Sequence, residues 1–288
     1  MTGLTVTLLG TGSPIPSAHR AGPSVLATLG EQRLLFDCGP GSVQRLVQKG
    51  VSPTEVSHLF LTHLHFDHCV DYAYLVLSRW DQGAGRIPEL EVYGPAGTVR
   101  MTRLLFEEGG VFAPDIAART QHPASQYRYE ARGGQLPRDP PAPVAADMAG
   151  GSSVERGTWR VQAIKVLHCD PFLVSLAYRL DSGERSLVVA GDTVPTGDLV
   201  ALAGGANVLI SGCHFLNGVH TDPRLPGCCS GHLDAARLAR DADVDTLVLV
   251  HIPVALGKRE LLNRIVDEAV QAFRGRIVVG RDLLDIPI

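Results

Sequence analysis

Short apolar runs bounded by Gly, Pro or Asp recur along the chain and predict a strand-rich fold. The predicted strands are 4–9, 24–29, 33–36, 57–61, 90–93, 159–167, 172–180, 186–190, 207–210, 246–250 and 276–279. Helical periodicity predicts helices at 42–49, 71–80, 97–108, 233–241 and 258–273. Because strands outnumber helices and the two types are mixed along the chain, the fold class is α/β or α+β.

Residues 109–157 break this pattern. The segment is rich in Pro and Gly, as in GGQLPRDPPAP, and shows little periodicity. An irregular segment of this length inside a compact domain is either a functional cover or disordered. We therefore expect a single domain over residues 1–288, with an insertion or lid at about 109–157.

Composition narrows the function classes. The chain has 288 residues, 45% of them hydrophobic, and a net charge of −4 with a pI near 6.2, so general nucleic-acid binding has little electrostatic support. No apolar run reaches the roughly 18 residues that would span a bilayer, and the first residues do not resemble a signal peptide. Six cysteines lack C-x-x-C spacing and are expected as free thiols. We expect a soluble, cytoplasmic protein.

The strongest chemical signal is THLHFDH, residues 62–68, directly after a predicted strand. His63 and His65 are two apart in extended chain, so their side chains project to one side and can bind one cation. Asp67 and His68 follow the turn and point elsewhere, which suits a second, adjacent metal. A polar loop that is rich in His by chance is the alternative, but the dense order of donors favours metal binding.

Three more donors follow predicted strands later in the chain: His168, Asp192 and His251. Functional groups gather at strand ends on sheet-based scaffolds. Taken alone, each would more often be a buried histidine or a turn-forming aspartate. Together with residues 62–68 they favour coordination.

The motif H-x-H-x-D-H, a distant His, then G-D-T and a strand-terminal His resembles the metallo-β-lactamase fold superfamily. LLGTGSPIPSAHRAGPS, LLFDCGPGSVQRL and SGHLDAARLA…LVLVHI resemble its ribonuclease Z and arylsulfatase-like branch of hydrolases. The resemblance covers nearly the whole chain except about residues 107–158. It implies an αββα four-layer sandwich, with two facing sheets, helices outside and the active site at one edge.

The resemblance also implies roles for individual residues. Asp192 would bridge both metals, Asp67 would orient a metal-bound hydroxide, and Asp37 would be an acceptor that holds the ligand loop; a simple turn-forming role for Asp37 stays open. The implied ligands are His63, His65 and His168 for one metal and Asp67, His68 and His251 for the other.

The chain departs from the ribonuclease Z pattern in three places. The glutamate usual in that branch is missing from Leu209–Phe215, so His232, which matches the proton-donating histidine, lacks its partner and is either a general acid or a helix-capping residue. The segment 107–158 lacks the basic character of a tRNA-binding arm. After His251, the last of the implied metal ligands, Ile252–Val254 stands where that branch usually has Ser and Arg. We therefore do not expect tRNA or another nucleic acid as substrate.

These observations predict a dinuclear metal-dependent hydrolase of a small-molecule phosphodiester or sulfate ester. A lactone, thioester or β-lactam hydrolase is the alternative, and a mono-iron oxidoreductase resembling sulfur dioxygenases is the second alternative. The donor set suits two divalent ions, Zn²⁺ before Mn²⁺ or Fe. We expect a small-molecule partner and no membrane, and leave a homodimer open.

Overall fold

The structure is a computed structural model that describes residues 3–219 and 224–288. The strands are β1 (Leu4–Gly10), β2 (Ser24–Leu29), β3 (Gln32–Phe36), β4 (Val56–Phe60), β5 (Glu91–Gly94), β6 (Val144–Asp147), β7 (Ser153–Arg156), β8 (Trp159–Val166), β9 (Ser175–Ser182), β10 (Arg185–Val189), β11 (Val208–Gly212), β12 (Thr246–Val250), β13 (Arg276–Val279) and β14 (Leu284–Ile286). The helices are α1 (Ser42–Gln48), α2 (Phe66–Cys69), α3 (Tyr72–Gly83), α4 (Thr98–Phe106), α5 (Ala113–Gln121), α6 (Pro123–Ala131), α7 (Gly197–Ala203), α8 (His232–Asp241) and α9 (Arg259–Ala272), with short 3₁₀ turns at Pro53–Glu55, Leu225–Gly227 and Val254–Leu256.

The strands form two sheets with a shared plan. One runs β14-β1-β2-β3-β4-β5-β6 and the other β13-β12-β11-β10-β9-β8-β7. In the first, β1, β2 and β3 pair antiparallel and β3 to β6 pair parallel. In the second, β7 to β10 pair antiparallel and β10 to β13 pair parallel. The parallel halves place the C-terminal ends of several strands at one edge of each sheet.

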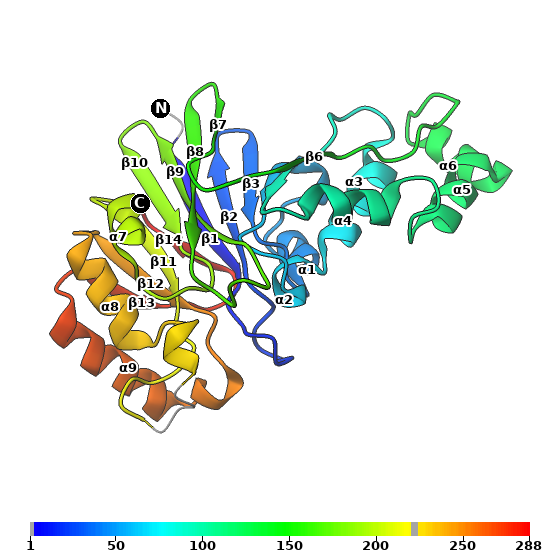
Figure 1. Cartoon of the computed structure of the whole chain (residues 1–288). Helices are drawn as coiled ribbons and strands as arrows, with labels where there is room; N and C mark the ends of the chain where they lie inside the picture. The colour runs from blue at the N-terminus through cyan, green and yellow to red at the C-terminus, as the bar shows by residue number, and fades with distance from the viewer. Residues whose placement is uncertain (1–2, 220–223) are drawn as a thin grey trace.

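Three apolar clusters hold the layers together. The first lies between the sheets and includes Phe36, Phe60 and Tyr178. The second packs α7, α8 and α9 on the outer face of the sheet that contains β10, and the third packs α1, α3 and α4 on the other sheet. Figure 1 shows these helices on opposite sides of the two sheets. The predicted αββα sandwich is confirmed.

The segment 109–157, which we expected to be an irregular insertion or lid, contains regular elements: α5, α6, β6 and β7. A high proline content usually indicates irregular chain. Here Pro114 and Pro123 stand in the first turn of α5 and α6, where a backbone N–H has no helical partner and its absence does not destabilise the helix. Figure 1 shows α5 and α6 extending outward from the sandwich beyond β6.

One carboxylate ties this protruding segment to the domain. Asp81 of α3 forms ion pairs with Arg119, Arg132 and Arg138, at N–O distances of 2.9, 2.6 and 3.2 Å. The Arg138 side chain is 2% exposed, and its guanidinium lies 3.8 Å from the centre of the Trp80 ring. The segment is therefore anchored at its base by buried charge and by cation–π contact.

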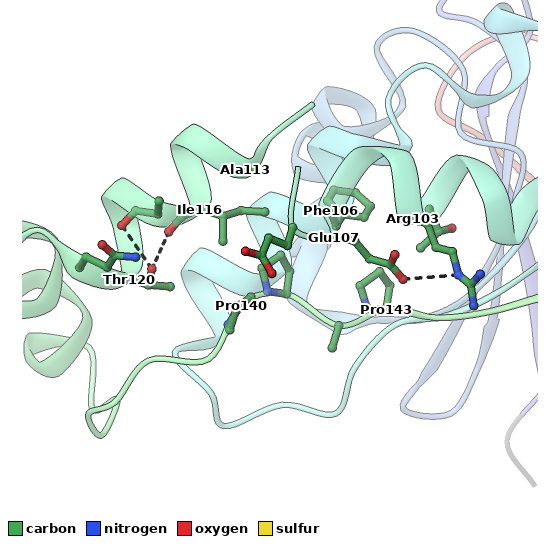
Figure 2. A pocket seen from close by; sticks show the side chains of 14 residues that line it. Arg103, Phe106, Glu107, Ala113, Ile116, Thr120, Pro140 and Pro143 are labelled. Atoms are coloured by element: carbon green, nitrogen blue, oxygen red, sulfur yellow. Dashed lines mark hydrogen bonds and ion pairs between the residues drawn. The ribbon is translucent and has the colours of Figure 1, made fainter. Parts of the chain in front are cut away.

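A cavity of about 700 Å³ lies where this segment meets α4, between α4, α5 and residues 140–143. Phe106, Ile116 and Pro143 form part of its apolar lining, and Arg103 and Glu107 lie at its edge (Figure 2). Its lining contains none of the predicted metal ligands, so the cavity is separate from the site described next. Within residues 3–219 and 224–288, no helix has the length and apolar character needed to cross a bilayer.

Candidate metal centre

The structure brings all seven predicted metal ligands to one edge of the sandwich. Each comes from a loop or short helix that follows the C-terminal end of a strand. His63 and His65 follow β4, Asp67 and His68 lie in α2, and His168, Asp192 and His251 follow β8, β10 and β12. Both sheets therefore contribute donors to the same place.

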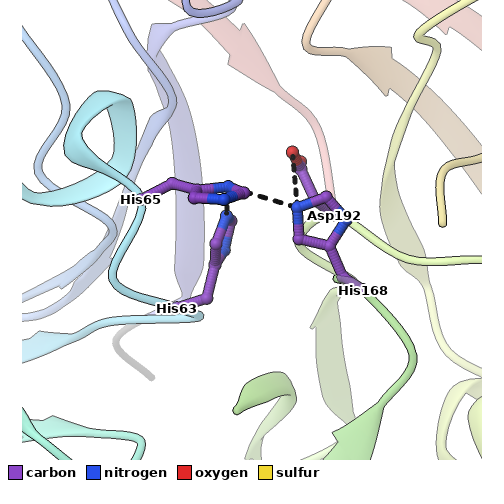
Figure 3. A group of neighbouring side chains, drawn as sticks. All are labelled: His63, His65, His168 and Asp192. Carbon is purple, nitrogen blue, oxygen red and sulfur yellow. Dashed lines mark hydrogen bonds and ion pairs between the residues drawn. The ribbon is translucent and has the colours of Figure 1, made fainter. Parts of the chain in front are cut away.

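The first donor set is made of His63, His65, His168 and Asp192, whose side chains point toward one another (Figure 3). Nδ1 of His65 lies 3.0 Å from Nε2 of His63 and 3.2 Å from Nε2 of His168. Nε2 of His168 is 3.9 Å from Oδ2 of Asp192. Tetrahedral ligands with bonds of about 2.0–2.2 Å stand roughly 3.3–3.6 Å apart, so this spacing fits a single cation.

The second donor set is made of Asp67, His68 and His251, with Asp192 beside it. Nε2 of His251 lies 3.3 Å from Oδ2 of Asp67 and 3.2 Å from Oδ2 of Asp192. Nε2 of His68 is 3.7 Å from Oδ2 of Asp67 and 3.6 Å from Oδ1 of Asp192. Asp192 is thus shared by both sets.

The converging atoms of the second set are buried without hydrogen-bond partners among the described residues. They are Oδ2 of Asp67 and Nε2 of both His68 and His251. Leaving buried polar atoms unpaired costs about 1–3 kcal/mol each. A divalent cation among them would satisfy all three atoms at once, so the residues present fit a metal.

Asp37 sets the orientation of two of the histidines. Its carboxylate accepts hydrogen bonds from the backbone N–H and hydroxyl of Thr62, at 2.7 and 2.9 Å, and from Nδ1–H of His68 at 2.8 Å. Since the Thr62 hydroxyl donates to Asp37, it accepts from Nδ1–H of His63. In the neutral form of both rings Nε2 is then the unprotonated nitrogen, which is the form that binds metal.

Neighbouring charges and burial shift the pKa values of the donor side chains. Burial would raise the pKa of Asp192, but His251, His214 and His68 hold that pKa well below its ordinary value, so the carboxylate is ionised. Burial lowers the pKa of His63 well below its ordinary value, and neighbouring imidazoles lower it further. Burial lowers the pKa of His251 as well. In contrast, Asp37 and Asp192 raise the pKa of His68 well above its ordinary value, and Asp192 raises the pKa of His214, both against burial. Ionised carboxylates and neutral imidazoles are the ligand forms of these side chains, so metal binding would displace a proton from His68 and from any other ring that is protonated.

Residues 19–251 match the family described as "Metallo-beta-lactamase superfamily". The chain belongs to this superfamily. The fold and the donor clusters agree with that membership, and the protein is a metal-dependent hydrolase whose fold implies divalent metal ions.

Relatives and solved structures refine this placement. The chain is 36% identical to a "Ribonuclease Z" of Mycobacterium bovis, over 97% of this chain and 96% of that protein. It is 35% identical to a "Ribonuclease Z" of Mycobacterium avium, over 96% of both. Among solved structures it resembles the metallo-beta-lactamase fold protein YhfI of Bacillus subtilis, with a TM-score of 0.75, 19% identity and coverage of 98% of both chains. Human tRNase Z, short form, gives a TM-score of 0.69, 20% identity and coverage of 99% of both chains.

The relatives named Ribonuclease Z contradict our expectation of a small-molecule substrate with tRNA or another nucleic acid excluded, and that expectation was wrong. It relied on the net charge and on the few basic residues in 107–158. Net charge reports a long-range field, whereas a nucleic acid can be held by local contacts at a few side chains. The missing glutamate and the changed residues after His251 do not outweigh a match over nearly the whole chain.

The structure does not bring His232 into the cluster. Its ring is fully buried, its Nε2–H donates to Glu268 of α9 at 2.7 Å, and its Nδ1 accepts from the backbone N–H of Asn217 at 3.2 Å. Within the described residues no hydrogen bond or ion pair joins it to the metal donors. Both nitrogens are occupied, so of the two roles left open by the sequence, general acid or structural residue, the geometry favours the structural one.

Sequence reasoning missed two residues of this region. Glu268 lies 36 positions after His232 on another helix, and no local pattern links the two. His214, whose Nε2 lies 3.3 Å from Oδ1 of Asp192, did give a signal, because it follows β11 just as the predicted donors follow their strands.

Metal content tests the donor sets directly. We expect close to two metal ions per purified chain, and we expect His63→Ala and Asp192→Ala to lose metal, because seven donors exceed what one four-coordinate ion needs. Elemental analysis after metal-supplemented expression measures this, with His122→Ala, on the protruding segment, as control. One ion or none in the wild type would contradict the expectation, and one iron would favour the oxygenase alternative.

Asp37→Asn tests the orienting carboxylate. The amide nitrogen of Asn cannot accept the hydrogen bonds of Thr62 and His68, so we expect metal affinity to fall by about 10- to 100-fold. Competition with a chromogenic chelator measures the change. Asp71→Asn, on a neighbouring loop and bonded to the backbone N–H of Val43, is the matched control. Equal affinities for the two variants would show that the Asp37 contacts are dispensable.

His232→Ala separates its structural and proton-donating roles. Because both ring nitrogens are bonded within the protein, we expect a lower melting temperature and an unchanged dependence of rate on leaving-group pKa. The measurement is a Brønsted plot for wild type and variant over a series of aryl and alkyl esters. Parallel lines are expected, whereas a steeper line for the variant would restore His232 as the general acid.

Proposed function

We propose that this protein is a dinuclear metallo-phosphodiesterase that cleaves RNA. The observation that carries the proposal is the convergence of two donor sets on one shared carboxylate, Asp192, at an edge built by both sheets. The relatives named Ribonuclease Z support RNA as the substrate.

In this proposal His63, His65 and His168 hold one cation, and Asp67, His68 and His251 hold the other, with Asp192 between them. Histidine and carboxylate donors at these spacings suit Zn²⁺, with Mn²⁺ as alternative. Two such cations supply Lewis acidity, which activates water at neutral pH and stabilises the negative charge that develops on a phosphoryl group.

Asp67 is the residue that we propose to orient the attacking water. Burial alone would raise its pKa, but His251 and His68 lower it below the ordinary value, so the side chain is an ionised acceptor. Its Oδ2 lies in the second donor set and lacks a hydrogen-bond partner among the described residues. A carboxylate that stays ionised can accept a hydrogen bond from a water molecule held beside it and so orient that water.

Exposed aromatic side chains next to the donors support a nucleic-acid substrate. Phe66, between His65 and Asp67, is 61% exposed, and Phe172, four residues after His168, is 90% exposed. Aromatic side chains near a backbone-binding site provide stacking surfaces for bases, worth about 1–3 kcal/mol per base. On the protruding segment, Tyr127 is 72% exposed and stands beside the exposed Arg128, so a stacking and a phosphate-binding group also occur there.

The test offers the metal-loaded protein a precursor tRNA transcript, an unstructured RNA of equal length, bis(p-nitrophenyl) phosphate, p-nitrophenyl sulfate and a lactone. We expect cleavage of RNA and of the aryl phosphodiester, and loss of both in His63→Ala. Preference for the folded transcript would support tRNA as the substrate. Hydrolysis of the lactone or the sulfate alone would overturn the proposal.

A further inference from the structure

His214 lies against the second donor set, although nothing in the motif of residues 62–68 points to it. It follows β11, and its side chain is 11% exposed. Its ring centre lies 4.4 Å from that of His251, and its Nε2 lies 3.3 Å from Oδ1 of Asp192. Donor atoms of Asp192, His214 and His251 lie within 4.8 Å of one another, so the three can hold one cation.

The hydrogen bonds of His214 resemble those of the predicted ligands. Its Nδ1 lies 3.2 Å from the carbonyl oxygen of Ser230, which can only accept, so Nδ1 carries the proton. His168 has the same arrangement with the carbonyl of Cys228 at 2.8 Å. Metal-binding histidines generally donate their second nitrogen to such an acceptor.

Among the described residues, the other nitrogen of His214 has no hydrogen-bond partner and lies beside the carboxylate of Asp192. Its Nε2 is buried and unpaired among the described residues, as are the converging atoms of Asp67, His68 and His251. In the neutral ring this nitrogen carries a lone pair, and the lone pair faces the carboxylate of Asp192. Two electron-rich atoms in contact repel each other unless a proton or a metal cation lies between them. Asp192 raises the pKa of His214 despite burial, so a metal cation bound here would take the place of that proton.

The backbone of β11 makes room for this ring. A Cβ atom at Gly212 would stand 2.3 Å from Cε1 and 2.9 Å from Nδ1 of His214. Any residue other than glycine at position 212 would therefore displace the imidazole of His214. This is the segment in which the resemblance led us to expect a glutamate, so the chain places a histidine here instead.

We propose that His214 is an additional metal ligand, which binds through Nε2 to the cation held by His251 and Asp192. The inference rests on the proposed dinuclear centre but not on its substrate. It makes the two sites unequal, because the second cation then has one protein donor more than the first. The two ions should therefore leave the protein in separate steps.

The test measures metal affinity without using activity. Zinc-loaded wild type and His214→Phe, which fills the space of the ring but offers no donor, are titrated with a chromogenic chelator. We expect one of the two ions to leave the variant at a chelator concentration at least about tenfold lower, while the other ion is retained as in the wild type. The visible spectrum of the Co²⁺-loaded protein should change with the altered ligand set.

Two further variants keep the test decisive. Gly212→Ala retains the histidine but displaces its ring, so it should reproduce the affinity loss of His214→Phe. His58→Phe replaces a buried histidine of β4 that packs on Trp159, and it should release metal as the wild type does. If His214→Phe does not fold, Gly212→Ala and its Co²⁺ spectrum decide the question.

The outcomes separate the inference from the proposed function. A wild type with fewer than two ions would overturn the dinuclear centre itself. A wild type with two ions, together with unchanged affinities and Co²⁺ spectra in both His214→Phe and Gly212→Ala, would overturn only the role of His214.

Discussion

The hydrogen bonds of the Asp37 carboxylate are the constraint on which the candidate metal centre depends. Asp37 follows β3 with a φ of 59°, a conformation that L-residues adopt rarely, and this turn directs its side chain to the end of β4. Its backbone N–H donates to the carbonyl of Phe60, and its own carbonyl accepts from the hydroxyl of Ser24. One residue thus links β2, β3, β4 and α2 and fixes two imidazoles at once.

The sandwich beneath the site makes this arrangement stiff. Phe36, Phe60 and Tyr178 pack as an aromatic group between the sheets, with ring centres 5.3 to 6.0 Å apart. The Tyr178 hydroxyl donates to the carbonyl of Leu61 at 2.8 Å, so β9 of one sheet is bonded to the chain that leads into the histidine motif. Packed aromatic side chains and a buried hydrogen bond keep the two edges at a constant separation.

Features that depend on local pattern, such as strands and donors at their ends, could be predicted from the sequence. Contacts between distant parts of the chain could not. Strand runs and donors at strand ends were recognisable, because period and position along the chain carry that information. The pairing of His232 with Glu268 was not, since it depends on how α8 packs on α9. Helices α5 and α6 were not predicted, because a high proline content usually indicates irregular chain. Here Pro114 and Pro123 stand in the first turn of each helix, where proline is tolerated. The substrate was misjudged because net charge carries little information about local contacts.

The order of the donors along the chain has a consequence for the order in which the two sites can form. Under the proposed assignment, the donors of the first cation end at Asp192, whereas the second cation needs His251, 59 residues later. On the ribosome, the first site can therefore close while β12 is still unmade. The second site can form only after β12 has paired with β11, so under this assignment the second ion would enter a chain in which the first site is already complete.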